Sequence, residues 1–315
     1  MATVRKLLEK INISTGFEEL FEGEIRFDEM MAAHTTFNVG GKADIWIRPE
    51  GKTAVQSIAL LLEAAKKACL PHLILGGGAN VVVADRGVRG LVIDTSGLVG
   101  CHFEGDTLRA GAGTSVDKAA EACAERSLSG LEFLAGMPGS IGGAVYMNAR
   151  CYGYSISDIL IETEILDENY ERRIVPLANE DFSYKKSPFQ NRPVIILSAL
   201  FRLARGNEVA LRSIMAQHRA DREAKGHYRL PSAGSSFKND YSFGKPTGQI
   251  VDELGLRGLS VGGARVAPWH GNIIVNEGSA TASDIRALTE LIAEKVWTAT
   301  GLKLECEILF VGEWD

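Results

Sequence analysis

The chain has 315 residues, of which 45% are hydrophobic and 23% charged, and this composition is typical of a globular protein with a substantial core. Its formal net charge of −6 argues against a general binding surface for nucleic acids or anionic membranes. The first 20 residues alternate apolar and charged side chains, unlike a signal peptide, and no apolar stretch is long enough to span a bilayer. We therefore expect a cytoplasmic protein without membrane insertion.

The cysteines agree with a reducing compartment. They are odd in number and scattered, and no two of them form a CxxC pair: Cys69, Cys101, Cys123, Cys151 and Cys306. The sequence therefore indicates neither a disulfide framework nor a zinc site, and we expect no bound metal.

The hydrophobic pattern predicts a mixed series of helices and strands. An N-terminal helix is expected at the start of the segment 1–85, and further helices over 53–70, 115–126, 208–224, 247–254 and 282–299. The expected strands cover 72–75, 81–84, 91–94, 143–147, 161–166, 193–203, 272–276 and 302–311. Thr281 and Asp284 form an approximate capping box for the last helix, and Gly301 ends it. Because there is no steady βαβ alternation, the pattern favours an α+β fold over a doubly wound sheet.

Two glycine-rich segments are the most distinctive local features. Leu75–Asn80 contains three consecutive glycines, whose backbone N–H groups can form an anion-binding turn suited to a pyrophosphate. A Rossmann fingerprint is excluded, because three valines, typical of a strand, follow where that motif needs a helix. Gly136–Ala144 is also rich in small residues and contains Pro138. Each segment alone could be an ordinary turn, but together they favour a large phosphate-containing cofactor.

Seven motifs in a fixed order resemble the UDP-N-acetylenolpyruvoylglucosamine reductase family. They are residues 35–41 (TTFNVGG), 75–80 (LGGGAN), 136–143 (GMPGSIGG), 182–187 (FSYKKS), 231–239 (PSAGSSFKN), 269–272 (WHGN) and 304–307 (LECE). Each motif alone is weak evidence, but the ordered set spans residues 30–312 and is highly specific. The short stretch between Lys186 and Ser235 resembles the compact subclass of that family.

The resemblance implies an FAD-binding region of the vanillyl-alcohol-oxidase type followed by a smaller α+β substrate domain. We expect domain ranges of 1–85 and 86–208 for the FAD-binding part and 209–315 for the substrate part. The implied activity is the reduction of UDP-N-acetylglucosamine enolpyruvate with NADPH as reductant and noncovalent FAD, for peptidoglycan synthesis. No obligate protein partner is implied. The implied FAD-binding residues are Thr36, Gly40, Gly41, Gly76, Gly77, Gly78, Ala79, Asn80, Gly136, Pro138, Gly139, Ser140, Gly142 and Gly143.

The resemblance also assigns the proton transfer. Ser235 matches the family's proton donor, and because a bare hydroxyl is a poor acid it needs a polarising or relaying partner. Glu307 lies on the polar face of the last expected strand, at the point where that face becomes apolar. Partial burial there would keep a proton available. Without the resemblance, a turn serine and a solvated glutamate would be the ordinary interpretations.

One expected catalytic position departs from the family pattern. Lys185 follows Tyr184 where the family usually has arginine, so a single point charge replaces a planar fork that could hold a carboxylate at two points. Lys185 or Lys186 could still stabilise a developing enolate, and both could equally be solvated loop lysines. Milder departures are Cys306 in place of proline, and Arg150 and Cys151 in place of small residues.

The remaining expected contacts are with the substrate. Tyr184, Lys238, Asn239 and His270 match positions that bind it in the family, the last three at its diphosphate and uridine end. Two other functions share the glycine loops: a flavin oxidase that passes electrons to oxygen, and a flavin or nucleotide-sugar binding protein that has lost catalysis. Only the reductase requires the Ser235–Glu307 pair.

Overall fold

The structure is a computed structural model that describes residues 17–178 and 181–314. The chain forms two compact units. The first unit contains the residues up to 28, residues 44–77 and residues 90–219; the second contains residues 29–43, 78–89 and 220–315. The chain thus passes between the units at five places, one of them the Gly77–Gly78 peptide. The expected division into three domains at residues 85 and 208 stays a prediction.

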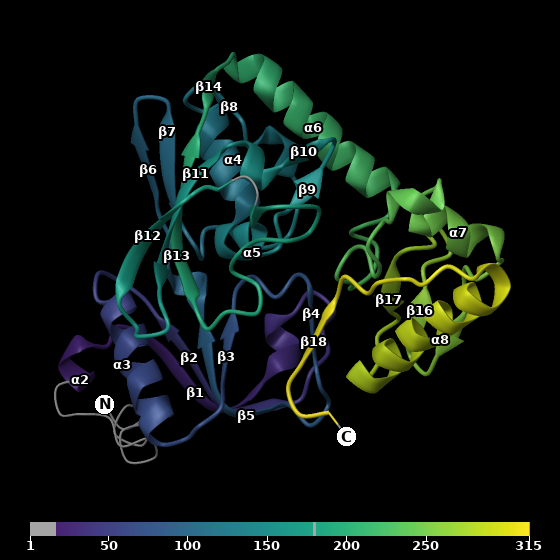
Figure 1. The fold of residues 1–315 in the computed structure, drawn as a ribbon, viewed down its shortest axis with the longest axis horizontal. Helices are drawn as coiled ribbons and strands as arrows, with labels where there is room; N and C mark the ends of the chain where they lie inside the picture. The colour runs from purple at the N-terminus through teal and green to yellow at the C-terminus, as the bar shows by residue number, and fades with distance from the viewer. Residues whose placement is uncertain (1–16, 179–180, 315) are drawn as a thin grey trace. The chain divides into compact units, whose positions relative to one another are not determined.

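Two sheets form the framework of the first unit (Figure 1). The four-stranded sheet has the order β1 (Gly23–Met30), β2 (Lys42–Pro49), β5 (Val88–Asp94) and β3 (His72–Leu75), with β3 and β5 parallel. The five-stranded sheet is antiparallel, in the order β12 (Arg172–Pro176), β11 (Leu160–Leu166), β13 (Ile195–Arg202), β7 (Thr107–Gly111) and β6 (Cys101–Glu104). Two short pairs join β8 (Leu128–Ser129) to β14 (Ala204–Arg205) and β9 (Arg150–Cys151) to β10 (Tyr154–Ser155).

Helices cover the core of this unit. Helix α3 (Ala54–Lys67) buries Ile58, Leu61 and Leu62 in one hydrophobic cluster with strand residues such as Ile45 and Ile93. The other helical elements are α2 (Phe17–Leu20), α4 (Val116–Ala124), α5 (Ile141–Tyr146), η2 (Thr95–Gly97), η3 (Glu132–Leu134) and η4 (Ile156–Asp158). The expected N-terminal helix lies outside the described residues except for α2.

The second unit has little regular sheet. A three-stranded antiparallel sheet runs β15 (Ser260–Val261), β16 (Ala264–Val266) and β17 (Ile274–Asn276), and β4 (Val81–Val83) pairs in parallel with β18 (Leu309–Val311). Helices α7 (Thr247–Glu253) and α8 (Ala282–Thr300) pack on this framework through Val251, Ile285 and Ile292. The short turns η1 (Met31–His34) and η6 (Tyr241–Phe243) complete the unit. Helix α6 (Glu208–Ala224) contains the change from the first unit to the second.

Most of the expected elements are confirmed, including the α+β class and the last helix. Thr281 and Asp284 form a capping box, and Gly301 ends α8 with a φ of 72°. None of the helices within residues 17–178 and 181–314 combines the length and apolarity needed to cross a membrane. The same residues contain no cluster of three or more potential metal ligands, and all five cysteines are free.

Two expected strands are wrong. Residues 143–147 belong mostly to helix α5, because the Ser140 hydroxyl accepts the Gly143 N–H and caps a new helix. The expected strand over 302–311 is reduced to Leu309–Val311. Before that, the short segment 236–238 forms a single bridge between Phe237 and Cys306. Strand pairing cannot continue without a longer partner.

Candidate active site

The two glycine-rich segments meet within the first unit. The Gly77 N–H donates to the Ser140 hydroxyl over 3.3 Å. A Cβ atom added to Gly77 would lie 2.7 Å from the Cα of Gly139, closer than real atoms approach. Gly139 itself has a φ of 121°, in the range that favours glycine. The structure therefore explains why both segments need glycine: their backbones touch.

The remaining residues of the second glycine segment lie around this contact. Gly136, with a φ of 73°, donates its N–H to Asp117, and a Cβ at Gly142 would lie 2.9 Å from the Ala112 side chain. Gly143 and Pro138 are exposed. The expected FAD-binding residues of this segment thus lead into helix α5 and form its first turn.

A second group of expected FAD-binding residues lies within the second unit. The Thr36 N–H donates to the Gly78 carbonyl over 3.1 Å, and a Cβ at Gly78 would lie 2.0 Å from the carbonyl oxygen of His34. Added Cβ atoms at Gly40 and Gly41 would likewise meet Val83 and the Asp85 carbonyl, at 2.9 Å and 2.0 Å. Gly40, Gly41 and Gly78 therefore all lie where a larger residue would displace its surroundings.

Two polar groups stand out in this part of the second unit. The Thr36 hydroxyl is buried and has no hydrogen-bond partner among the described residues. A buried polar atom of this kind is a position at which a ligand can supply the missing bond. Asn80, which follows Ala79, instead donates its side-chain N–H to the Glu307 carbonyl over 2.9 Å.

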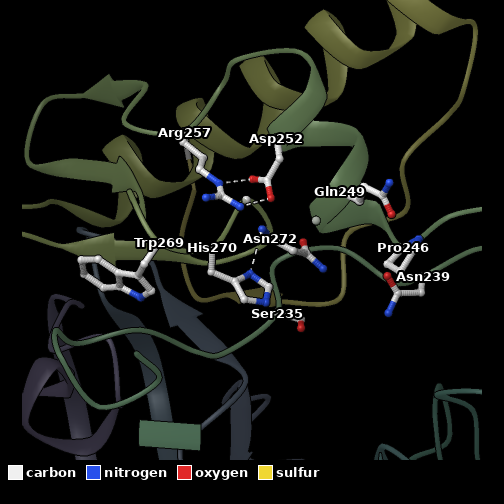
Figure 2. Close-up of a pocket in the computed structure, with 11 residues that line it drawn as sticks. Ser235, Asn239, Pro246, Gln249, Asp252, Arg257, Trp269, His270 and Asn272 are labelled. Atoms are coloured by element: carbon white, nitrogen blue, oxygen red, sulfur yellow. Dashed lines mark hydrogen bonds and ion pairs between the residues drawn. The ribbon is translucent and has the colours of Figure 1, made fainter. Parts of the chain in front are cut away.

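Ser235 lines a pocket of about 250 Å³ within the second unit (Figure 2). Asn239 and His270 also line it, as expected substrate-binding residues. Sequence reasoning gave no role to Gln249, Asp252 and Arg257, which line it too. The last two form a bidentate ion pair within five residues of each other. No motif marks these residues, because their place at the pocket depends on how α7 and the loop after it pack.

His270 presents a defined hydrogen-bonding pattern to this pocket. Its Nδ1 accepts the Asn272 backbone N–H over 3.1 Å, as the dashed line in Figure 2 shows, so the neutral ring carries its proton on Nε2. Burial, followed by the charges of Arg257 and Lys225, lowers the pKa of His270, while Asp252 opposes the shift. His270 is therefore a neutral donor at neutral pH.

Glu307 lies beside the segment that carries Ser235. Its backbone N–H donates to the Ser236 carbonyl over 2.8 Å, and the residue is only 8% exposed. Glu305, two residues earlier, is exposed, and its carboxylate lies 2.5 Å from the Lys238 ammonium. The structure thus separates the two glutamates: Glu307 is buried next to Ser236, and Glu305 pairs with a residue that we expected to bind substrate.

The expected Tyr184–Lys185 segment forms a tight turn in the first unit. Ser183 and Lys186 are joined by two backbone hydrogen bonds of 3.2 and 3.0 Å. Lys185 has a φ of 58°, and its carbonyl accepts the Gln190 side-chain N–H over 3.1 Å. Tyr184 and Lys185 are half-buried and Lys186 is exposed. The turn therefore distinguishes the two lysines by their burial.

A second half-buried histidine, His227, lies near the pocket. The ring of His227 is 6.1 Å from the ring of His270. Burial lowers the pKa of His227 to about 4, with further contributions from Arg222, His270 and Lys225 that Asp221 partly opposes. The fold therefore holds His227 in its neutral form.

This histidine gives a prediction for stability against pH. The folded-state pKa lies below the unfolded value of 6.5, so the unfolded chain takes up the proton first. His227 should therefore contribute its full stability above pH 6.5 and lose it as the pH falls towards about 4, at up to ~1.4 kcal/mol per pH unit. Urea unfolding of the wild type and His227→Gln, with the exposed His102→Gln as control, measures this. If the difference in the free energy of unfolding between wild type and His227→Gln is the same at pH 7 and pH 4, the prediction is wrong.

Comparisons with known proteins identify two domain families along the chain. The model of an FAD-binding domain matches residues 45–171, and that of the UDP-N-acetylenolpyruvoylglucosamine reductase C-terminal domain matches residues 226–311. The reductase of that name from Treponema denticola is 40% identical, with the alignment covering 93% of this chain and 95% of the relative. The Bacillus velezensis reductase is 39% identical, with coverage of 92% and 95%.

A solved structure leads to the same family. The crystal structure of UDP-N-acetylenolpyruvylglucosamine reductase from Thermus caldophilus aligns with a TM-score of 0.75 and 30% identity, over 92% of this chain and 99% of that chain. The sequence motifs, the glycine contacts and the relatives at full length are consistent with one another. The chain belongs to the UDP-N-acetylenolpyruvoylglucosamine reductase family.

Proposed function

We propose that this chain reduces UDP-N-acetylglucosamine enolpyruvate to UDP-N-acetylmuramate, with FAD as cofactor and NADPH as reductant. The supporting relatives come from several bacterial lineages and align over nearly their whole length. The observation that carries the proposal is the pairing of the Ser235 segment with Glu307 beside a pocket of about 250 Å³. The five free cysteines are consistent with a cytoplasmic enzyme of this kind.

The residues present fit an FAD cofactor. The close backbone approach of Gly77 and Gly139 leaves no room for side chains, and the Thr36 hydroxyl is buried without a partner among the described residues. We propose that these residues and their neighbours in the glycine segments hold the cofactor, with backbone N–H groups contacting its phosphates. Bound FAD supplies the hydride chemistry, and the protein has to supply a proton and stabilise charge.

We propose Ser235 as the proton donor and Glu307 as the group that supports it. Reduction of the enolpyruvyl double bond needs a proton at the carbon next to the one that receives hydride. The burial of Glu307 and its backbone bond to Ser236 favour it over the exposed Glu305 in this role. Lys185, half-buried in its turn, is the proposed cation for the developing enolate.

The pocket around His270 is the proposed site for the nucleotide end of the substrate. The Nε2–H of His270 is a donor at neutral pH, and Asn239 adds an amide. Lys238 is held by Glu305 and Arg257 by Asp252, so an anionic ligand has to compete with these carboxylates. Tyr184 is proposed as a further substrate contact.

The first prediction from this proposal concerns cofactor retention. Gly77→Val should yield protein with little or no FAD, because its side chain would enter the backbone of Gly139 and Ser140. The flavin-to-protein absorbance ratio of the purified protein measures this. The flavin content of Gly77→Ala is compared with that of Gly206→Ala as a matched control. A Cβ at Gly206 would meet only side-chain atoms, at 3.2 Å or more. Full flavin occupancy of Gly77→Val would remove the glycine segments from the cofactor site.

The second prediction separates the two half-reactions. Ser235→Ala should leave the reduction of FAD by NADPH nearly intact and slow reoxidation by the enolpyruvyl substrate by ~10²–10⁴-fold, as expected for a lost general acid. Ser260→Ala is the control, because Ser260 is an exposed serine of the same unit, on β15. Stopped-flow flavin absorbance follows both steps. Equal slowing of both steps in Ser235→Ala would show that Ser235 is structural.

The third prediction tests Lys185. Lys185→Met should slow only the substrate half-reaction, by an amount equivalent to ~2.7–4 kcal/mol for one preorganised donor. Lys185→Arg should retain activity, since its fork can bind a carboxylate at two points. Neither replacement is glycine, so the left-handed backbone of residue 185 affects both variants alike. Lys186→Met is the matched control, and a normal rate for Lys185→Met with a collapsed rate for Lys186→Met would transfer the role to Lys186.

A further inference from the structure

Asn272 is a buried amide that binds the segment directly after Ser235. It is only 3% exposed. Its Nδ2 donates to the Phe237 carbonyl over 2.8 Å, and its Oδ1 accepts the Phe237 N–H over 2.9 Å. The side chain thus makes the pair of hydrogen bonds that a neighbouring strand would make. Asn272 belongs to the WHGN motif of residues 269–272, which by itself assigns the residue no role.

The backbone around Asn272 adds to this attachment. The Asn272 carbonyl accepts the Ser236 N–H over 2.8 Å, and the Ile274 N–H donates to the Ser236 hydroxyl over 3.2 Å. Ser236 and Phe237 are therefore held through their N–H, carbonyl and hydroxyl groups. The Glu307 N–H, which donates to the Ser236 carbonyl, completes the set.

The chain before Ser235 is attached further away from it: the Pro231 carbonyl accepts the Asn276 N–H over 2.9 Å, and Ala233 is 9% exposed. Gly234 has a φ of 71°, and a Cβ added there would meet no atom within 4 Å. At Gly234 itself no neighbouring atom would restrain a side chain, and the left-handed conformation is one that glycine leaves readily. Ser235 forms an isolated bridge with Ile273, and the two residues after Ser235 are held by Asn272, so the position of the Ser235 hydroxyl depends on the segment 272–273.

We infer that Asn272 is a positioning residue that orients the Ser235 hydroxyl for proton transfer by holding Ser236 and Phe237. This inference rests on the proposed role of Ser235. Asn272 also donates its own N–H to Nδ1 of His270, so one residue orients the proposed proton donor and fixes the tautomer of a proposed substrate contact. Because effective proton transfer requires close alignment, a shift of the order of 1 Å can cost ~10²-fold in rate.

The test uses Asn272→Asp, which keeps the shape of the side chain. An ionised aspartate can accept the Phe237 N–H but repels the Phe237 carbonyl, whereas a protonated one restores both hydrogen bonds. Substrate-driven reoxidation relative to wild type should be ~10²-fold slower near pH 8 and should recover as the pH falls. As long as the pH is above the pKa of the new carboxyl, each pH unit of acidification raises its protonated fraction about tenfold. Flavin reduction by NADPH should stay within a few-fold of wild type at both pH values.

The matched control is Asn276→Asp. Asn276 is 4% exposed, lies on the next part of the same segment, and donates its Nδ2–H to the Phe37 carbonyl over 2.9 Å. The same substitution there places a carboxylate against a carbonyl that is not attached to Ser235. It should lower stability and FAD retention, while the flavin-loaded protein shows the wild-type pH dependence of reoxidation.

Amide hydrogen exchange gives a readout independent of turnover. Peptides covering residues 234–238 should exchange faster than wild type in Asn272→Asp near pH 8, and should approach wild type near pH 5.5 after correction for intrinsic rates. In Asn276→Asp these peptides should exchange as in wild type. Unchanged exchange at 234–238 in Asn272→Asp would overturn the inference.

A double mutant distinguishes this inference from the proposed function. If Asn272 acts through Ser235, adding Asn272→Asp to Ser235→Ala should cause little further loss of reoxidation rate. A full additional loss, or equal slowing of both half-reactions by Asn272→Asp alone, overturns the positioning role while leaving Ser235 as donor. If Ser235→Ala alone reoxidises normally, the proposed function of Ser235 fails first.

Discussion

Asparagine side chains take the place of strand pairing in the second unit. Its sheets are short, and three asparagine amides link backbone segments that are distant in sequence: Asn80 to Glu307, Asn272 to Phe237, and Asn276 to Phe37. An amide carries a donor and an acceptor in one plane, so it can satisfy a backbone peptide group that no strand reaches. Removing one would leave a buried carbonyl unsatisfied, at a cost of ~1–3 kcal/mol. The proposed catalytic groups depend on these links, because Glu307 is one of the linked residues and Ser235 lies two residues before another, Phe237.

The pocket beside Ser235 is neutral as a result of pairing. Lys238 and Arg257 both have carboxylate partners, and burial keeps His227 and His270 uncharged at neutral pH. Neutral donors and exchangeable ion pairs avoid the cost of leaving cations unpaired in a partly buried site. They also make the site sensitive to acid, because protonated His270 could no longer accept the Asn272 N–H through Nδ1.

The glycine segments of the first unit meet a different physical requirement. Most glycines in a chain mark turns, but Gly77 is needed because the backbone of Gly139 and Ser140 fills the place of its side chain. The Ser140 hydroxyl accepts both the Gly77 and the Gly143 N–H groups, so it joins the two segments and caps helix α5. The same serine explains why residues 143–147 are largely helical. The apolar residues of this stretch are also typical of a strand, but the Ser140 cap starts a helix there.

The sequence by itself determined the family, the α+β class, the long helices and the order of the motifs. These features depend on local periodicity, on caps such as Thr281 with Asp284, and on residue types such as consecutive glycines. All of these are local properties of the sequence. Only the tertiary structure decided which polar groups meet. The hydrogen bonds of Asn272 with Phe237 join two distant parts of the chain. Packing decides that Glu307 is buried while Glu305 is exposed. Packing also places the ion pair of Asp252 with Arg257 at the pocket. Burial and hydrogen-bond partners are properties of the packed chain, so no local pattern predicts them.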